Sequence, residues 1–119
     1  MEPLPTFIGV RLRGGFRIAD IQISNEPLTD AIGRDAIAQT TISGRDFCLL
    51  IRPGLSVAEL SITLYHEALE AATVACDDCP ASVAEFTEGD FERVAHEAHE
   101  RFGAATPASL NRMLEEHGF

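Results

Sequence analysis

The sequence predicts an α+β fold: an N-terminal antiparallel β-hairpin and a third strand, followed by two main helices and a short C-terminal helix. Two observations place the strands. Apolar residues alternate with polar ones near the N-terminus, and a compact apolar run, "RDFCLLIR" at 45–52, is closed by Pro53-Gly54. A third observation places the helices, since apolar residues recur at helical spacing after residue 56. With 119 residues, 45% of them hydrophobic, we expect one domain spanning 1–119.

The expected hairpin occupies residues 1–24. "TFIGVRL" and "FRIADIQI" have the alternation of strands, and "RGG" between them is typical of a turn. The apolar positions change phase after Ile18, which predicts a β-bulge or a bend. Residues 25–44 show no clear period, so a short helix and an irregular loop both remain open for them.

Three helix starts carry capping signals. Ser56 with Glu59 forms a capping box before a helix at 57–76, which "CDDCPAS" ends because proline cannot continue the ladder. A second start lies at Thr87, before a helix at 88–102 that Gly103 ends. A third lies at Thr106-Pro107, before a short last helix.

Charge and composition narrow the classes of partner. Residues 1–55 hold six acids and six arginines, so the whole net charge of −10 lies in residues 56–119, together with all four histidines. An acidic surface repels phosphate, so we expect no nucleic-acid partner. No apolar run approaches the ~18 residues of a membrane span, and the N-terminus lacks the layout of a signal peptide. We therefore expect no membrane association and a cytoplasmic location.

Three cysteines are too few, and odd in number, for a disulfide framework, so Cys48, Cys76 and Cys79 are expected to be reduced thiols. Cys76 and Cys79 form a C-x-x-C pair, and His96 and His99 follow. Their spacing suits a structural zinc site poorly, because such sites prefer a shorter loop and a wider histidine gap. A thioredoxin-like role is also disfavoured, because the pair follows a helix instead of starting one.

The helix at 57–76 is apolar nearly all round, which is typical of a buried helix. One narrow polar stripe remains, formed by Glu59, Thr63, His66, Glu70 and Thr73. His66 and Glu70 are four residues apart and therefore neighbours on one face, so both can reach the same cation. Glu67 lies about 100° further round the helix, where it can face a water molecule held by that cation. The stripe must meet solvent, a partner group or a site, and a metal site is the alternative that His66 and Glu70 favour.

"TLYHEALEAA" at 63–72 resembles the H-E-x-x-H helix of small zincin-like metallopeptidases, and it reads H-E-x-x-E. The resemblance covers about residues 45–102 and includes the preceding strand and the following helix. It implies a minimal zincin-like architecture that acts on a peptide or protein substrate, with His66 as the first metal ligand and Glu67 as the general base. Glu70 stands where the family has histidine. Zinc is the expected cofactor, and a carboxylate at that position also admits manganese or another divalent cation.

The family's third ligand comes from the following helix or the loop before it. In the helix at 88–102, Glu88, Glu92 and His99 flank one edge of the apolar face, whereas His96 lies nearer to solvent. We take Glu88 and His99 as the candidates. Each also has a purely structural interpretation. Glu88 can be a first-turn acid that the helix dipole favours, and His99 can be a histidine that makes a hydrogen bond.

A second interpretation comes from a different class of protein. In it, the helix at 57–76 is a structural core element of a non-catalytic interaction module, with or without a structural metal. Such a small acidic chain with so apolar a helix can bury part of it in a homodimer. Hydrolysis that Glu67→Gln abolishes while the metal stays bound would indicate the first interpretation.

Overall fold

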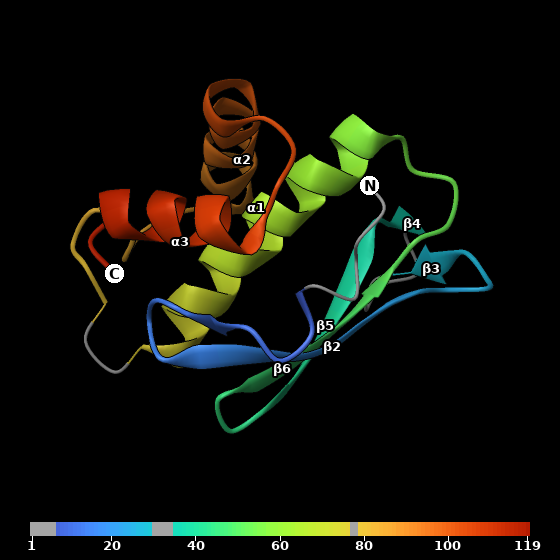
Figure 1. Cartoon of the computed structure of the whole chain (residues 1–119), viewed down its shortest axis with the longest axis horizontal. Coiled ribbons are helices and arrows are strands. Elements are labelled where there is room, and N and C mark those ends of the chain that lie inside the picture. Colours follow the sequence, from blue (N-terminus) through green and yellow to red (C-terminus); the bar gives the residue numbers. More distant parts are fainter. Residues whose placement is uncertain (1–6, 30–34, 77–78) are drawn as a thin grey trace.

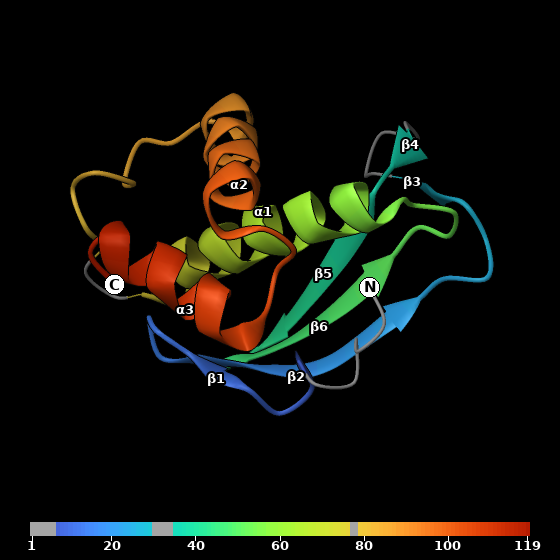
Figure 2. The same ribbon diagram turned by 45° about the horizontal axis from the view of Figure 1, so that its top comes forward.

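The computed structural model describes residues 7–29, 35–76 and 79–119. Within these residues the chain is α+β, as predicted, with helices covering one face of a mixed sheet (Figures 1 and 2). The sheet has four strands in the order β1-β2-β6-β5. Their bounds are β1 Arg11–Leu12, β2 Phe16–Ile23, β5 Ala38–Ser43 and β6 Asp46–Ile51.

Both kinds of strand pairing occur in this sheet. β1 and β2 form the predicted antiparallel hairpin, but its first strand is limited to Arg11–Leu12, and residues 1–6 of the predicted hairpin lie outside the described part. β5 and β6 form a second hairpin. Between the hairpins, β2 runs parallel to β6, with Ile21 opposite Leu49 and Ile23 opposite Ile51. The register of this pair shifts between Ile18 and Asp20, which confirms the irregularity expected from the phase change in the sequence.

The segment 25–44 is neither a helix nor wholly a loop. Where it is described, it forms the two-stranded ribbon of β3 (Leu28–Thr29) and β4 (Asp35–Ala36) and then the edge strand β5. Residues 30–34 lie outside the described part. β5 carries no alternating apolar pattern because most of its side chains are exposed, so the periodicity that reveals half-buried strands is missing here.

Helix α1, Val57–Ala75, lies across one face of the sheet (Figure 2). The sheet contributes a buried apolar face, formed by Phe16, Ile18, Ile21, Phe47, Leu49 and Ile51. Leu64, Ala68 and Ala71 are buried on α1, and they enclose with four of these side chains a void of only about 10 Å³. Helix and sheet are therefore closely packed.

Helix α2, Glu88–Phe102, packs against α1, and α3, Pro107–Glu116, lies against α1 and β1. All three helices begin with a capping box at a predicted cap: Ser56, Thr87 and Thr106. The loop between α2 and α3 is fixed to α1 by Tyr65, whose hydroxyl lies 3.1 Å from the carbonyl oxygen of Gly103. The orientation of α2 on α1 decides which of its side chains meet the polar stripe.

One prediction about the cysteines is wrong. Cys76 and Cys79 form a disulfide, whereas Cys48 on β6 is a free, exposed thiol. Cys76 caps the C-terminus of α1, and its Cα atom lies 5.5 Å from that of Cys79, close enough for the two sulfurs to be bonded. None of the helices in the described ranges is long and apolar enough to cross a membrane.

Candidate metal centre

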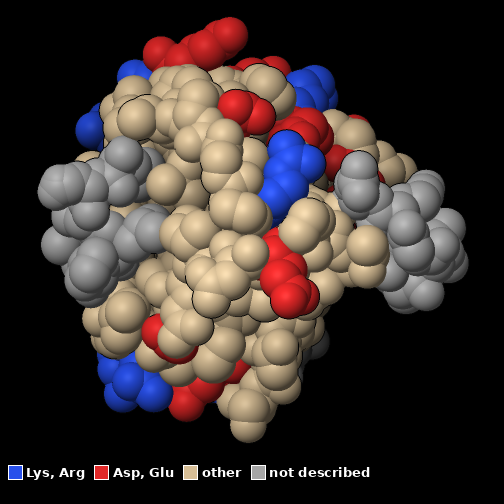
Figure 3. Space-filling model, turned by 90° about the vertical axis from the view of Figure 1, so that its right-hand side faces the viewer, with Lys and Arg blue, Asp and Glu red and all other residues tan. Residues whose placement is uncertain are grey.

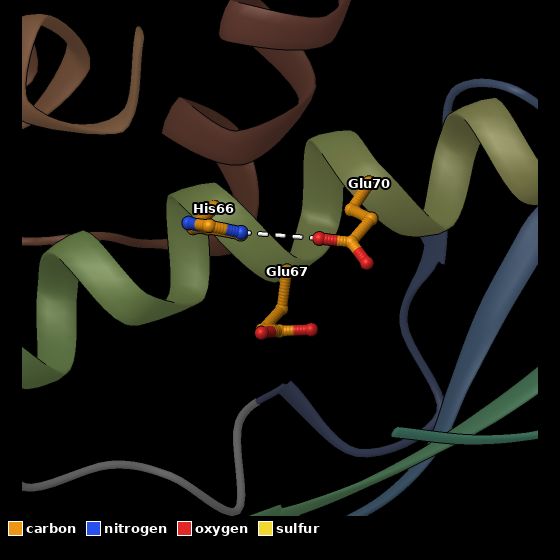
Figure 4. Close-up of side chains that lie close together, drawn as sticks. All are labelled: His66, Glu67 and Glu70. Atoms are coloured by element: carbon orange, nitrogen blue, oxygen red, sulfur yellow. Dashed lines mark hydrogen bonds and ion pairs between the residues drawn. The ribbon is translucent and has the colours of Figure 1, made fainter. Parts of the chain in front are cut away.

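His66 lies at the centre of a cluster of carboxylates. The side chain is 15% exposed. Its Nε2 lies 3.0 Å from Oε2 of Glu70, one turn along α1 (Figure 4). The same nitrogen lies 3.1 Å from Oε2 of Glu88 on α2. One ring nitrogen therefore faces two carboxylate oxygens from two different helices.

The first two turns of α2 complete the cluster. Glu88 is the first residue of the helix, and Glu92 follows one turn later on the same edge. Oε1 of Glu92 lies 3.5 Å from Nδ1, the other ring nitrogen of His66. The His66 ring also lies against Phe91, with ring centroids 6.0 Å apart. Both ring nitrogens thus have acidic neighbours, and the ring is held between the two helices.

Glu67 points from α1 towards the strands (Figure 4). Its Oε2 accepts a hydrogen bond of 2.8 Å from the hydroxyl of Thr40 on β5. The carboxylate is largely buried, and this burial raises its pKa above the ordinary value of 4.5, although the Thr40 hydrogen bond acts in the opposite direction. Glu67 is therefore a fixed carboxylate with increased proton affinity, as a general base requires.

His66, Glu67 and Glu70 each offer a ligand atom within 4.8 Å of the others. Among the described residues, this is the group whose spacing suits a metal ion. A cavity of about 290 Å³ opens beside it, lined by Ile37, Ala38, Thr63, His66, Glu67, Glu88 and Glu92. The apolar part of this lining comes from the strand side, and the charged part comes from α1 and α2.

The charges of the cluster favour a cation. Burial lowers the pKa of His66, but the hydrogen bonds with Glu70 and Glu92 and the charges of Glu67 and Glu70 outweigh it and raise that pKa to about 9. The same contact lowers the pKa of Glu70, whereas burial raises the pKa of Glu88. At neutral pH without a metal, the cluster therefore holds a positive charge as the imidazolium of His66.

One face of the molecule shows both charge signs. On the face of the molecule seen in Figure 3, acidic side chains gather in several groups, with arginines among them and a large uncharged area between. The arginines of α2 pair with other acids: Arg93 contacts Asp90 and Glu97, and Arg101 contacts Glu116. The cation that contacts Glu70, Glu88 and Glu92 in the described structure is His66.

His99 lies elsewhere. Its Nδ1 is 2.8 Å from the hydroxyl oxygen of Ser61, which is fully buried on α1 and also accepts a hydrogen bond of 2.8 Å from the backbone N–H of Ala105. His99 is eleven residues after Glu88, which is about 16 Å along a helix, so the two do not reach the same point. Of the two candidates for the third ligand, the structure brings Glu88 to His66 and gives His99 a structural contact.

Two participants were not selected from the sequence. Glu92 lies on the same edge of its helix as Glu88, and its i,i+4 spacing from Glu88 is the signal in the sequence that points to it. Thr40 could not be found, because its strand has no recognisable pattern and its contact with Glu67 spans 27 positions. The alternative zinc site of two cysteines and two histidines is not formed, since Cys76 and Cys79 are bonded to each other and His96 is exposed.

Comparison with known proteins identified no relative of the chain. No protein-family model, no curated protein and no solved structure gave a significant match to the chain.

Proposed function

We propose that this chain is a metal-dependent hydrolase with a minimal zincin-like site. In this proposal, His66, Glu70 and Glu88 bind one divalent cation, and Glu67 acts as the general base on a peptide-like bond. The substrate is a peptide or protein segment that enters the cavity beside Ile37 and Ala38. A cytoplasmic location remains part of the proposal.

One observation carries the proposal: Nε2 of His66 lies 3.0 and 3.1 Å from carboxylate oxygens of Glu70 and Glu88. Ligand atoms bound to zinc at ~2.0–2.2 Å in a tetrahedral arrangement are about 3.4 Å apart. The donor atoms therefore need to separate by only a few tenths of an ångström to admit a cation. One imidazole nitrogen and two carboxylate oxygens suit zinc and manganese alike.

Each residue has a role that follows from its contacts. A bound divalent cation supplies Lewis-acid polarisation and makes water more acidic. Glu67 is held by Thr40 on the cavity side, where it can take a proton from a water molecule and deliver it to the leaving amine. Glu92, next to Nδ1 of His66, can accept a hydrogen bond from that nitrogen and so orient the imidazole.

Calorimetric titration of the metal-free protein with Zn²⁺ and with Mn²⁺ tests the ligand set. We expect one ion per chain and a loss of affinity of more than about tenfold in Glu70→Gln and Glu88→Gln, because even outer partners of metal ligands typically contribute 10–100-fold. Glu100→Gln is the matched control, since Glu100 is an exposed acid of α2 away from the cluster. Equal affinities in all four proteins would exclude this ligand set.

A further inference from the structure

We propose that Cys76 and Cys79 are a reversible thiol–disulfide pair that regulates the cation site through the last turn of α1. The regulatory effect rests on the proposed function, whereas the redox chemistry of the pair does not. The two cysteines lie at the end of the helix that carries His66 and Glu70, on the path to the helix that carries Glu88.

The disulfide occupies a helix end that has little other support. The last turn of α1 has no basic residue, and the helix ends at Cys76 in an extended conformation without a glycine cap. The N–H of Cys76 donates to the carbonyl of Ala72, and Arg45 donates to the carbonyl of Ala75 at 3.2 Å. Closing the ring to Cys79 restricts this end of the helix, and opening it allows the last turn to fray.

Thr73 connects the sulfurs to the carboxylate cluster. Its carbonyl oxygen lies 3.3 Å from Sγ of Cys76 and 3.1 Å from Sγ of Cys79. Its hydroxyl donates to the backbone carbonyl of Glu70 at 2.7 Å. Movement of the last turn therefore reaches the backbone of Glu70, a partner of His66.

The same contact makes opening reversible without unfolding. In the disulfide neither sulfur carries a proton, but in the dithiol each S–H can donate to the Thr73 carbonyl. That carbonyl is one of the last four of the helix, and these carbonyls have no N–H donor within the helix. The dithiol thus keeps hydrogen bonds to the helix end, and these are weaker than the covalent link, so the last turn loosens while the helix stays folded. Both cysteines are also partly exposed, so a small thiol can reach them.

The pair also begins the connection to α2. After Cys79, this connection is held by Val83, which is 2% exposed, and by Phe86, whose ring packs on Phe91 at 5.4 Å between centroids. Glu88 then starts α2. The disulfide shortens the free part of the connection between the two helices that form the cluster, and so it favours the arrangement in which their carboxylates converge.

The redox step uses a small-molecule thiol such as glutathione or dithiothreitol. A thiolate attacks one sulfur, the S–S bond breaks, and a mixed disulfide forms while the other cysteine leaves as a thiolate. A second thiolate releases the first cysteine. The protein disulfide is reduced to two thiols, and the reagent is oxidised to its disulfide.

Thiol titration tests the pair in a Cys48→Ser background, which removes the remaining free thiol. The folded protein is equilibrated in dithiothreitol redox buffers, quenched with acid and labelled with a maleimide, and its mass is measured. We expect one two-electron transition, with circular dichroism unchanged and faster amide exchange at Cys76 in the reduced form. Reduction that requires denaturant, or a pair that never oxidises, would overturn the proposal.

The regulatory effect is measured by Zn²⁺ titration of unlabelled protein from the same equilibrations, after the dithiothreitol has been removed under nitrogen because its thiolates bind zinc. We expect affinity about fivefold weaker in the reduced protein. The double variant Cys76→Ser, Cys79→Ser should have the Zn²⁺ affinity of the reduced protein, and treatment with dithiothreitol should not change that affinity. Equal affinities in both states would overturn the regulation. If neither state binds Zn²⁺, the proposed function and the regulation fail together, while the thiol titration and the amide exchange still decide whether the pair is reversible.

Discussion

The hydroxyl of Thr40 on the edge strand β5 donates a 2.8 Å hydrogen bond to Oε2 of Glu67 on α1. This bond joins the sheet to the helix at the one carboxylate of the H-E-x-x-E motif that faces the strands. It holds Glu67 in place and partly offsets the cost of burying it, although burial still raises the pKa of Glu67. Glu67 is thus kept in a position that is unfavourable for its own charge, which is typical of a functional carboxylate.

Glu67→Gln should therefore separate stability from activity. The neutral amide removes the cost of a buried charge and can still accept the Thr40 hydrogen bond, so we expect an unchanged or higher melting temperature. Hydrolysis of a peptide-library substrate should disappear because the amide cannot take a proton. Thermal denaturation and a fluorescence-quenched peptide assay measure the two effects. Full activity in this variant would remove Glu67 from the mechanism.

The metal-free protein should lose stability as the pH rises from 6.5 to 9. The folded-state pKa of His66 is about 9, above its ordinary value of 6.5. The proton is therefore bound more tightly in the folded state, so its stabilising contribution is complete below pH 6.5 and is lost as the pH passes 9. Urea denaturation across this range, with EDTA present, measures the effect.

His66→Gln should flatten this pH dependence, and His96→Gln should leave it as in the wild type. His96 is the matched control because it is an exposed histidine of α2. A wild-type slope that survives in His66→Gln would mean that another group is responsible.

Ser61→Ala should destabilise the fold and leave cation binding unchanged. The substitution removes the acceptor for the buried N–H of Ala105 and the partner of His99, at a cost of about 1–3 kcal/mol. Ser82→Ala is the control, since Ser82 is exposed and contacts a surface carbonyl. Urea denaturation and Zn²⁺ titration are both needed. A loss of Zn²⁺ affinity in folded Ser61→Ala protein would indicate that His99 contributes to the cation site.

The sequence predicts those parts of the fold that depend on local signals. The capping residues Ser56 and Thr87 mark the starts of α1 and α2, because capping and helical periodicity involve residues within a few positions. β5 and the parallel pairing of β2 with β6 were not predicted. Their evidence is non-local, since β5 is recognised only by its partner β6 and not by a pattern of its own.

The residues of the site also differ in whether local sequence or tertiary packing places them. His66, Glu67 and Glu70 belong to one helix, and helical spacing alone brings them together. The choice between Glu88 and His99 could not be made from sequence, because both lie on one edge of α2. It depends on where α2 crosses α1: the first turn of α2 meets His66, and the fourth meets Ser61.

Elemental analysis of the native protein tests the central claim most directly. The protein is purified without a polyhistidine tag and without chelator, alongside His66→Ala and the control His96→Ala. We expect close to one zinc or manganese ion per chain in the wild type and in His96→Ala, little or none in His66→Ala, and a lower melting temperature of the wild type after EDTA. Metal-free wild-type protein whose melting temperature does not respond to Zn²⁺, Mn²⁺ or EDTA would contradict the account.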